Sequence, residues 1–104
     1  MTPYIDVTFQ RIDRYPSIES AIHRWVARFE AMRLEVRRAN ATVEPAGRSR
    51  TAIKLTLVLG DGIARRAITM HADPYVAVSD AFRQVRQQAL AAAPAERAAS
   101  RLVA

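Results

Sequence analysis

The chain has 104 residues, of which half are hydrophobic and a quarter are charged, as is typical of a single globular domain. It contains no cysteine, which excludes disulfide frameworks, thiolate metal sites and cysteine nucleophiles. No apolar stretch approaches the roughly 20 residues of a membrane-spanning helix, and the N-terminus lacks the pattern of a secretory signal. We therefore expect a cytoplasmic protein with no membrane partner.

The charge is strongly basic. Lysine and arginine total 16 against 10 acidic residues, which gives a net charge of +6 and an isoelectric point near 11.0. A surplus of this size on a small domain favours an anionic partner, and nucleic acid is the commonest one. A basic protein without such a partner is an equal alternative on charge alone.

The first third of the chain changes its hydrophobic period once. Residues 4–10 alternate between apolar and polar side chains, which predicts a strand with one buried face. Residues 17–37 then repeat apolar side chains at spacings of three and four, without glycine or proline, as an amphipathic helix does. Two starts are possible for this helix: Ser17 is its N-cap, or Pro16 already lies just inside its first turn.

Three further strands are predicted in the middle of the chain. Residues 39–44 alternate and are followed by a turn at 45–50. Residues 51–59 alternate most clearly, and the sequence Gly60-Asp61-Gly62 predicts a hairpin that leads into a strand at 63–72. The residues of this last strand that we expect to face the core are Ile68, Met70 and Ala72.

A second amphipathic helix is predicted to start at Asp73-Pro74, because aspartate is a preferred N-cap and proline is tolerated in the first turn. The alanine-rich residues 91–104 are interrupted by Pro94 and are expected to form a short helix or a loose tail. The sequence thus predicts one domain over residues 1–92 and a C-terminal tail over 93–104.

The predicted order is β-α-β-β-β-α. A helix between the first two strands makes them parallel if they are neighbours, whereas short turns make the other pairs antiparallel. Two amphipathic helices can then cover one face of a four-stranded mixed sheet, which is an α+β two-layer sandwich. In this arrangement Phe29 and Phe82 are both expected to be buried against the sheet.

The sequence contains no pattern of a catalytic or metal site. His23 and His71 are the only histidines, and neither belongs to a metal-ligand spacing. The acidic residues are scattered, and Gly60-Asp61-Gly62 contains too few glycines to form a phosphate-binding loop. We expect no enzyme activity, no metal, no cofactor and no small-molecule substrate.

The arginines are arranged in pairs. Arg24 and Arg28 lie one turn apart on the first predicted helix, and Arg83 and Arg86 lie one turn apart on the last. If the helices cover the same face of the sheet, these four side chains can share one surface, and the arginine fork suits phosphate. A second cluster on or beside the last two strands contains Arg48, Arg50, Arg65 and Arg66.

The segment His71–Leu90 resembles the Asp-x-Tyr-x-Ala-Ile start of the final helix in the ribosome hibernation promoting factors. The matching positions are Asp73, Tyr75, Ala77 and Val78. The first helix, with Pro16-Ser17-Ile18, Ile22, Val26, Arg28, Phe29 and Glu30, and the strand Ile5-Asp6-Val7-Thr8-Phe9 are also similar to that family. The resemblance covers about residues 4–90. Gln84 and Gln87 stand where the family usually has basic residues.

The resemblance implies a ribosome-binding translation inhibitor of the stress response. Members of the family bind the small ribosomal subunit in the channel used by messenger and transfer RNA, through basic residues of the two helices. By this resemblance, the residues expected to contact ribosomal RNA are Arg24, Arg28, Arg83 and Arg86, with Arg65 and Arg66 as a secondary patch. The alternative is a divergent domain of the same fold that serves as a protein-interaction or regulatory module without ribosome binding.

Overall fold

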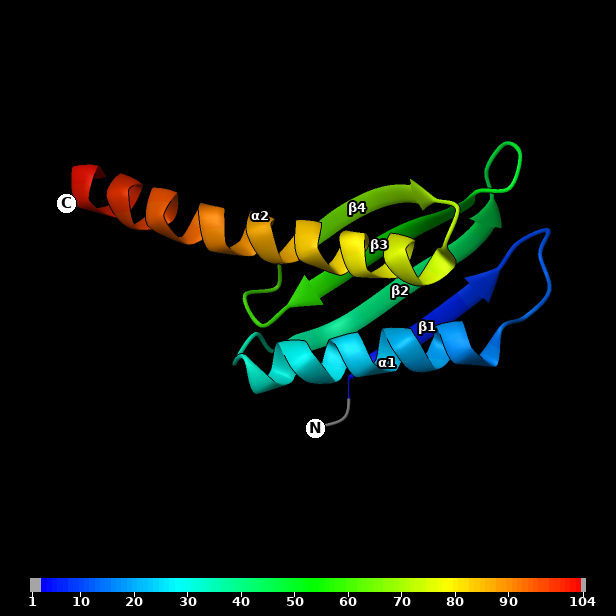
Figure 1. Cartoon of the computed structure of the whole chain (residues 1–104). Coiled ribbons are helices and arrows are strands. Elements are labelled where there is room, and N and C mark those ends of the chain that lie inside the picture. The colour runs from blue at the N-terminus through cyan, green and yellow to red at the C-terminus, as the bar shows by residue number, and fades with distance from the viewer. Residues whose placement is uncertain (1–2, 104) are drawn as a thin grey trace.

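The structure is a computed structural model that describes residues 3–103, with the side chains described as far as residue 91. Over this part of the chain the elements follow in the predicted order (Figure 1). They are β1 (Tyr4–Phe9), α1 (Pro16–Ala31), β2 (Val36–Pro45), β3 (Thr51–Leu59), β4 (Ala64–His71) and α2 (Pro74–Val103).

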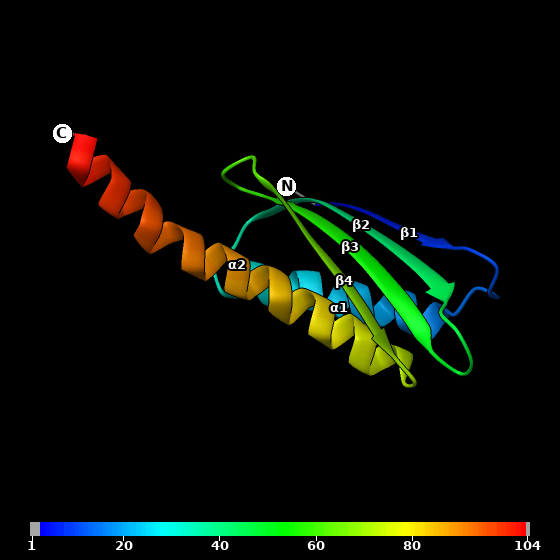
Figure 2. The same cartoon turned by 90° about the horizontal axis from the view of Figure 1, so that it is seen from above.

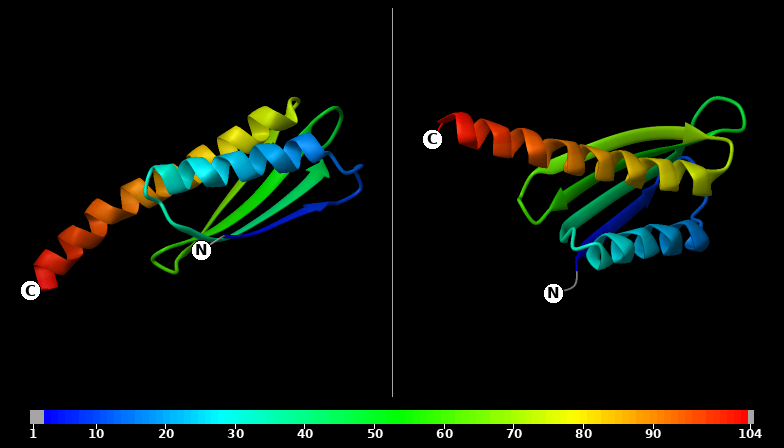
Figure 3. Two further views of the ribbon diagram at one scale, coloured as in Figure 1. Left: turned by 90° about the horizontal axis from the view of Figure 1, so that it is seen from below. Right: turned by 60° about the vertical axis from the view of Figure 1, so that its left-hand side comes forward.

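The strands form one mixed sheet in the order β1-β2-β3-β4. β1 runs parallel to β2, whereas β2, β3 and β4 are antiparallel neighbours. Both helices lie on the same face of the sheet, and the other face is left uncovered (Figures 2 and 3). The predicted α+β two-layer sandwich is therefore confirmed.

The core lies between the sheet and the two helices. The side chains of Phe29 and Phe82 are fully buried, as predicted, and their ring centroids lie 5.6 Å apart in an edge-to-face arrangement. The inward faces of β2 and β3 complete this core. Their buried aliphatic side chains are Val36, Ala39, Ala41, Val43, Ile53, Leu55, Leu57 and Leu59.

The first helix is shorter than the sequence predicts, because it ends at Ala31 rather than near residue 37. The amide of Leu34 donates to the carbonyl of Phe29 at 2.8 Å, and Arg33 adopts a left-handed conformation with φ of 63°. This hydrogen bond is typical of the Schellman motif, in which glycine is the usual left-handed residue. At the other end Pro16, not Ser17, lies just inside the helix, with Tyr15 at the N-cap.

The predicted inward face of β4 is wrong. Ile68 and Met70 are 65% and 58% exposed and lie on the uncovered face of the sheet, and Ala72 lies beyond the strand. The inward side chains are instead Arg65, Ala67 and Thr69. Two of these are polar, but each has a partner: Thr69 donates to the carbonyl of Ala77 at 2.6 Å, and Arg65 pairs with Asp61.

The last helix runs without a break to Val103, whereas the sequence predicts an interruption at Pro94. Alanine is the best helix former, and the alanines on both sides of Pro94 favour this continuation. The boundary between domain and tail at residues 92 and 93 stays a prediction. In the described part of the chain, neither helix has a stretch that is both long and apolar enough to span a membrane.

Candidate nucleic-acid interface

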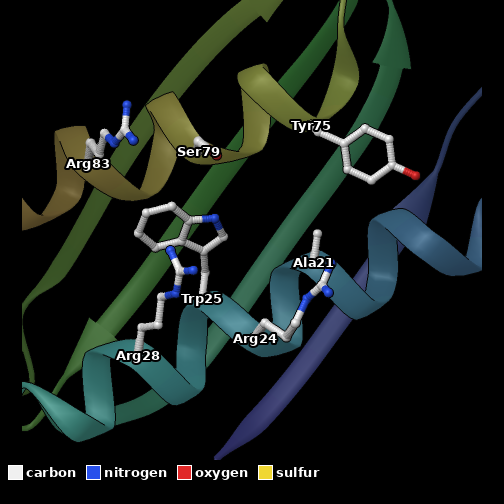
Figure 4. A pocket seen from close by; sticks show the side chains of 7 residues that line it. All are labelled: Ala21, Arg24, Trp25, Arg28, Tyr75, Ser79 and Arg83. Carbon is white, nitrogen blue, oxygen red and sulfur yellow. The ribbon is translucent and has the colours of Figure 1, made fainter.

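A groove with a volume of about 370 Å³ lies between α1 and α2 on the outer side of the helical layer (Figure 4). Helix α1 contributes one wall and α2 the other. The lining side chains are Ala21, Arg24, Trp25, Arg28, Tyr75, Ser79 and Arg83. Three of the four arginines predicted on the helices therefore line this groove.

The spacing of the side chains along each helix produces this convergence. Arg24 and Arg28 are four residues apart on α1, and Tyr75, Ser79 and Arg83 repeat at the same interval on α2. Residues four apart lie on one face of a helix, one turn above the other. Each helix thus turns one polar row toward the groove while its apolar stripe packs on the sheet.

Trp25 links this groove to the core. Its ring lies 5.7 Å from that of Phe82, centroid to centroid, and the two planes differ by 13°, so the rings are stacked. The guanidinium carbon of Arg28 lies 4.9 Å from the centroid of the indole, within the range of a cation–π interaction. The half-buried indole, packed on Phe82, therefore holds a positively charged side chain at the groove.

Hydrogen bonds fix one end of the groove. The hydroxyl of Tyr75 and the hydroxyl of Ser17 lie 2.6 Å apart and form a hydrogen bond between the two helices. Asp73 caps α2, since its carboxylate accepts the amide of Tyr75 at 2.9 Å. The ring Nδ1 of His71 in turn accepts the amide of Asp73 at 2.9 Å. His71 therefore has a structural partner at the start of α2.

The groove lining is positively charged, and among the described side chains no acidic one lines it. Its lining includes three arginines and no aspartate or glutamate. Over the described side chains, the ion pairs join Arg11 and Lys54 to Glu44, Arg14 to Glu19, and Arg65 to Asp61. None of these pairs involves Arg24, Arg28, Arg83 or Arg86. The groove can therefore offer several guanidinium groups to an anion at once.

The other predicted arginines are distributed differently. Arg86 is exposed on α2 but does not line the groove, and Arg66 is exposed on the uncovered face of the sheet. Arg65 is only 8% exposed, with a guanidinium nitrogen 2.8 Å from a carboxylate oxygen of Asp61. The expectation that Arg65 and Arg66 form one surface patch is therefore wrong, because neighbouring residues of a strand point to opposite faces. Gln84 and Gln87 are exposed and also lie outside the groove lining.

The pair formed by Asp61 and Arg65 carries a prediction about stability. Asp61→Ala leaves the buried guanidinium of Arg65 without its carboxylate, so we expect a loss of about 1.5–3 kcal/mol in the free energy of unfolding. Adding Arg65→Met removes the stranded charge and should recover much of that loss, as measured by urea denaturation. A double variant no more stable than Asp61→Ala would contradict this account.

The same pair predicts a pH dependence. The hydrogen bond from Arg65 lowers the pKa of Asp61 below its ordinary value. Because the pKa is lower in the folded state, the contribution is present above the unfolded-state pKa of about 3.9 and is lost as the pH falls below it. The stability difference between wild type and Asp61→Asn should therefore shrink as the pH is lowered from about 5 to 2.

Three side chains of the groove, Trp25, Tyr75 and Ser79, carry no sign of a function in the sequence. Trp25 belongs to the apolar stripe of the first predicted helix, and Tyr75 to that of the second, while Ser79 is one of many polar residues on the outer face. The signal that could have identified Trp25 is its position between Arg24 and Arg28, at the edge of the stripe. Among the described residues, no group of three or more histidine, aspartate or glutamate side chains could hold a metal ion.

Solved structures of two other proteins have the same architecture. The N-terminal domain of Thermus thermophilus Protein Y superposes with a TM-score of 0.70 at 20% sequence identity, covering 85% of this chain and 94% of that domain. The chain has the fold of this domain. A ribosomal subunit interface protein from Coxiella burnetii superposes with a TM-score of 0.71 at 18% identity, covering 82% of this chain and 91% of that one.

These likenesses confirm, at the level of the fold, the resemblance noted in the sequence. No family model matches the sequence, and no curated protein matches it. The comparisons therefore support a common architecture.

Proposed function

We propose that this protein binds the small ribosomal subunit in the cytoplasm and represses translation under stress. The observation that carries the proposal is the groove between α1 and α2, which brings together Arg24, Arg28 and Arg83 with no acidic side chain in its lining. A fold shared with a protein named for the ribosomal subunit interface supports the same partner.

The proposed mechanism is occupation of a site rather than catalysis. The guanidinium groups of the groove bind backbone phosphates of ribosomal RNA through charge-assisted, bidentate hydrogen bonds. Arg86 and the exposed face of α2 add further contacts. Bound in the channel for messenger and transfer RNA, as the resemblance to hibernation promoting factors implies, the domain excludes both RNAs.

Co-sedimentation with purified ribosomal subunits tests this proposal. We expect the protein to sediment with the small subunit and not with the large one. Each phosphate contact releases counterions, so three or four contacts should give a log–log slope of affinity against salt of about −2 to −4. Equal sedimentation with both subunits would refute selective binding to the small subunit, and sedimentation with neither at low salt would refute ribosome binding.

The alternative is a protein-interaction module without ribosome binding. The uncovered face of the sheet favours it, because Ile68 and Met70 on the edge strand β4 are 65% and 58% exposed there. Large apolar side chains exposed together often mark a contact with another protein. A folded protein that sediments with neither subunit would support this second function.

A further inference from the structure

A row of stacked groups leads from the core to the open side of the groove. Phe82 is fully buried and stacks on Trp25, with the two ring planes only 13° apart. Arg28 continues the row, with its guanidinium carbon 4.9 Å from the centroid of the indole. Figure 4 shows this guanidinium in front of the indole, on the side from which the groove is viewed.

The guanidinium at the end of this row is available to a ligand. Arg28 is exposed, and it takes part in none of the ion pairs formed by the described side chains. Its contact with Trp25 restrains a side chain that would otherwise be mobile. A planar guanidinium is a surface on which nucleic-acid bases stack, and a restrained one loses less entropy when they do.

The rest of the groove suits the sugar and phosphate of a nucleotide. Arg24 on α1 and Arg83 on α2 place positive charge on both walls. Ala21 and Ser79, the smallest side chains of the lining, leave room between the helices. The volume of about 370 Å³ lies within the range of about 300–1,000 Å³ that is usual for small-molecule sites.

We propose that the groove binds one unpaired nucleotide of RNA. Its base stacks on the face of the Arg28 guanidinium, and its phosphates contact Arg24, Arg83 and the N–H edge of Arg28. A base within a duplex is covered by its neighbours on both faces, so only an unstacked base can reach the guanidinium. This inference deepens the proposed function, because it defines which part of an RNA the groove recognises.

Short oligonucleotides test the inference without ribosomes. A labelled single strand of about six nucleotides is compared by fluorescence anisotropy with an abasic strand of the same length and with a duplex. We expect the single strand to bind about tenfold more tightly than the abasic strand, with the same salt dependence because the phosphates are unchanged. Equal affinity for the intact and abasic strands would overturn the proposal.

The chain has only one tryptophan, Trp25, which reports on the groove directly. Binding of the intact strand should change its fluorescence, whereas binding that leaves this fluorescence unchanged would place the base elsewhere and overturn the proposal. Adenosine monophosphate is titrated as a free nucleotide, and ribose 5-phosphate as a sugar phosphate without a base. Comparing both with the strand shows whether the groove binds a free nucleotide or a nucleotide of an RNA chain. A nucleotide that binds as tightly as the strand would overturn the assignment to RNA.

Arg28→Lys is the decisive variant, because it keeps the charge and removes the planar surface. We expect it to lose the preference for the intact over the abasic strand while affinity for the abasic strand stays within about twofold. Arg48→Lys makes the same change on the loop between β2 and β3, outside the groove lining, and should keep the preference. Equal behaviour of the two variants would contradict the assignment of the base to Arg28.

The outcome is separable from that of the proposed function. If the protein sediments with the small subunit but shows no preference for intact strands, the proposed function is supported and the nucleotide site is refuted. If the protein binds intact strands more tightly than abasic ones but sediments with neither subunit, the nucleotide site is supported and the ribosomal partner is refuted.

Discussion

Replacing Phe82 by alanine is expected to lower the free energy of unfolding by about 3–5 kcal/mol. The Phe82 ring is fully buried between the sheet and the helices, and it contacts both Phe29 and Trp25. Its removal leaves a cavity beside both rings. For a small domain, whose stability is typically 5–15 kcal/mol, this loss is a large fraction of the total. Urea denaturation followed by far-ultraviolet circular dichroism measures it.

Phe82→Leu is the matched control, because it keeps most of the apolar volume and removes only the aromatic ring. We expect it to cost less than about 1.5 kcal/mol. If alanine proved as mild as leucine, the interface between α2 and the sheet would be able to collapse around the cavity, and the central place assigned to this ring would be wrong.

The element order could be predicted from the sequence because the hydrophobic period changes wherever a strand and a helix meet, and turn residues separate the three consecutive strands. Residues 51–59 alternate without interruption, and β3 has these same bounds. The end of α1 could not be predicted in this way. Its stop signal is Arg33 in the left-handed conformation, a position where glycine is the residue that sequence analysis looks for.

The orientation of β4 was predicted wrongly for a different reason. Its larger apolar residues, Ile68 and Met70, suggest the buried face by size alone. Arg65 and Thr69 can occupy the buried face because Asp61 and the carbonyl of Ala77 satisfy their polar groups. Both partners lie outside the strand, so a pattern within the strand contains no information about them.

The candidate site was predicted in part. The pairing of Arg24 with Arg28 is a property of one helix and is visible in the sequence. The approach of Arg83 to that pair depends on how α1 packs beside α2, which helical spacing does not define. The same packing turns Trp25 from an ordinary core residue into the support of a charged group at the groove.

Replacing Arg24, Arg28 and Arg83 together by glutamine is expected to weaken binding to the small subunit by a factor on the order of 100. Each arginine contributes about 1 kcal/mol or more through charge-assisted hydrogen bonds to phosphate, and about 1.4 kcal/mol corresponds to a factor of ten. The slope of log affinity against log salt should fall in magnitude by about 2–3, since three contacts are lost. Titrations of subunit binding at several salt concentrations measure both quantities.

The matched control removes the same charge from elsewhere on the molecule. Arg48, Arg50 and Arg66 are exposed, take part in no ion pair among the described side chains, and lie outside the groove. Their replacement by glutamine should change affinity by less than about threefold, since unfocused surface charge acts weakly at physiological salt.

Both triple variants should stay folded. Surface substitutions usually change stability by no more than about 0.5 kcal/mol, and the contact of Arg28 with Trp25 adds about 0.5–1 kcal/mol. Thermal unfolding curves check this before binding is compared. An equal loss of affinity in the two folded variants would mean that total charge, and not the groove between the helices, governs binding. The groove would then have no special part in RNA recognition, because three arginines on the loop and the uncovered face would serve as well.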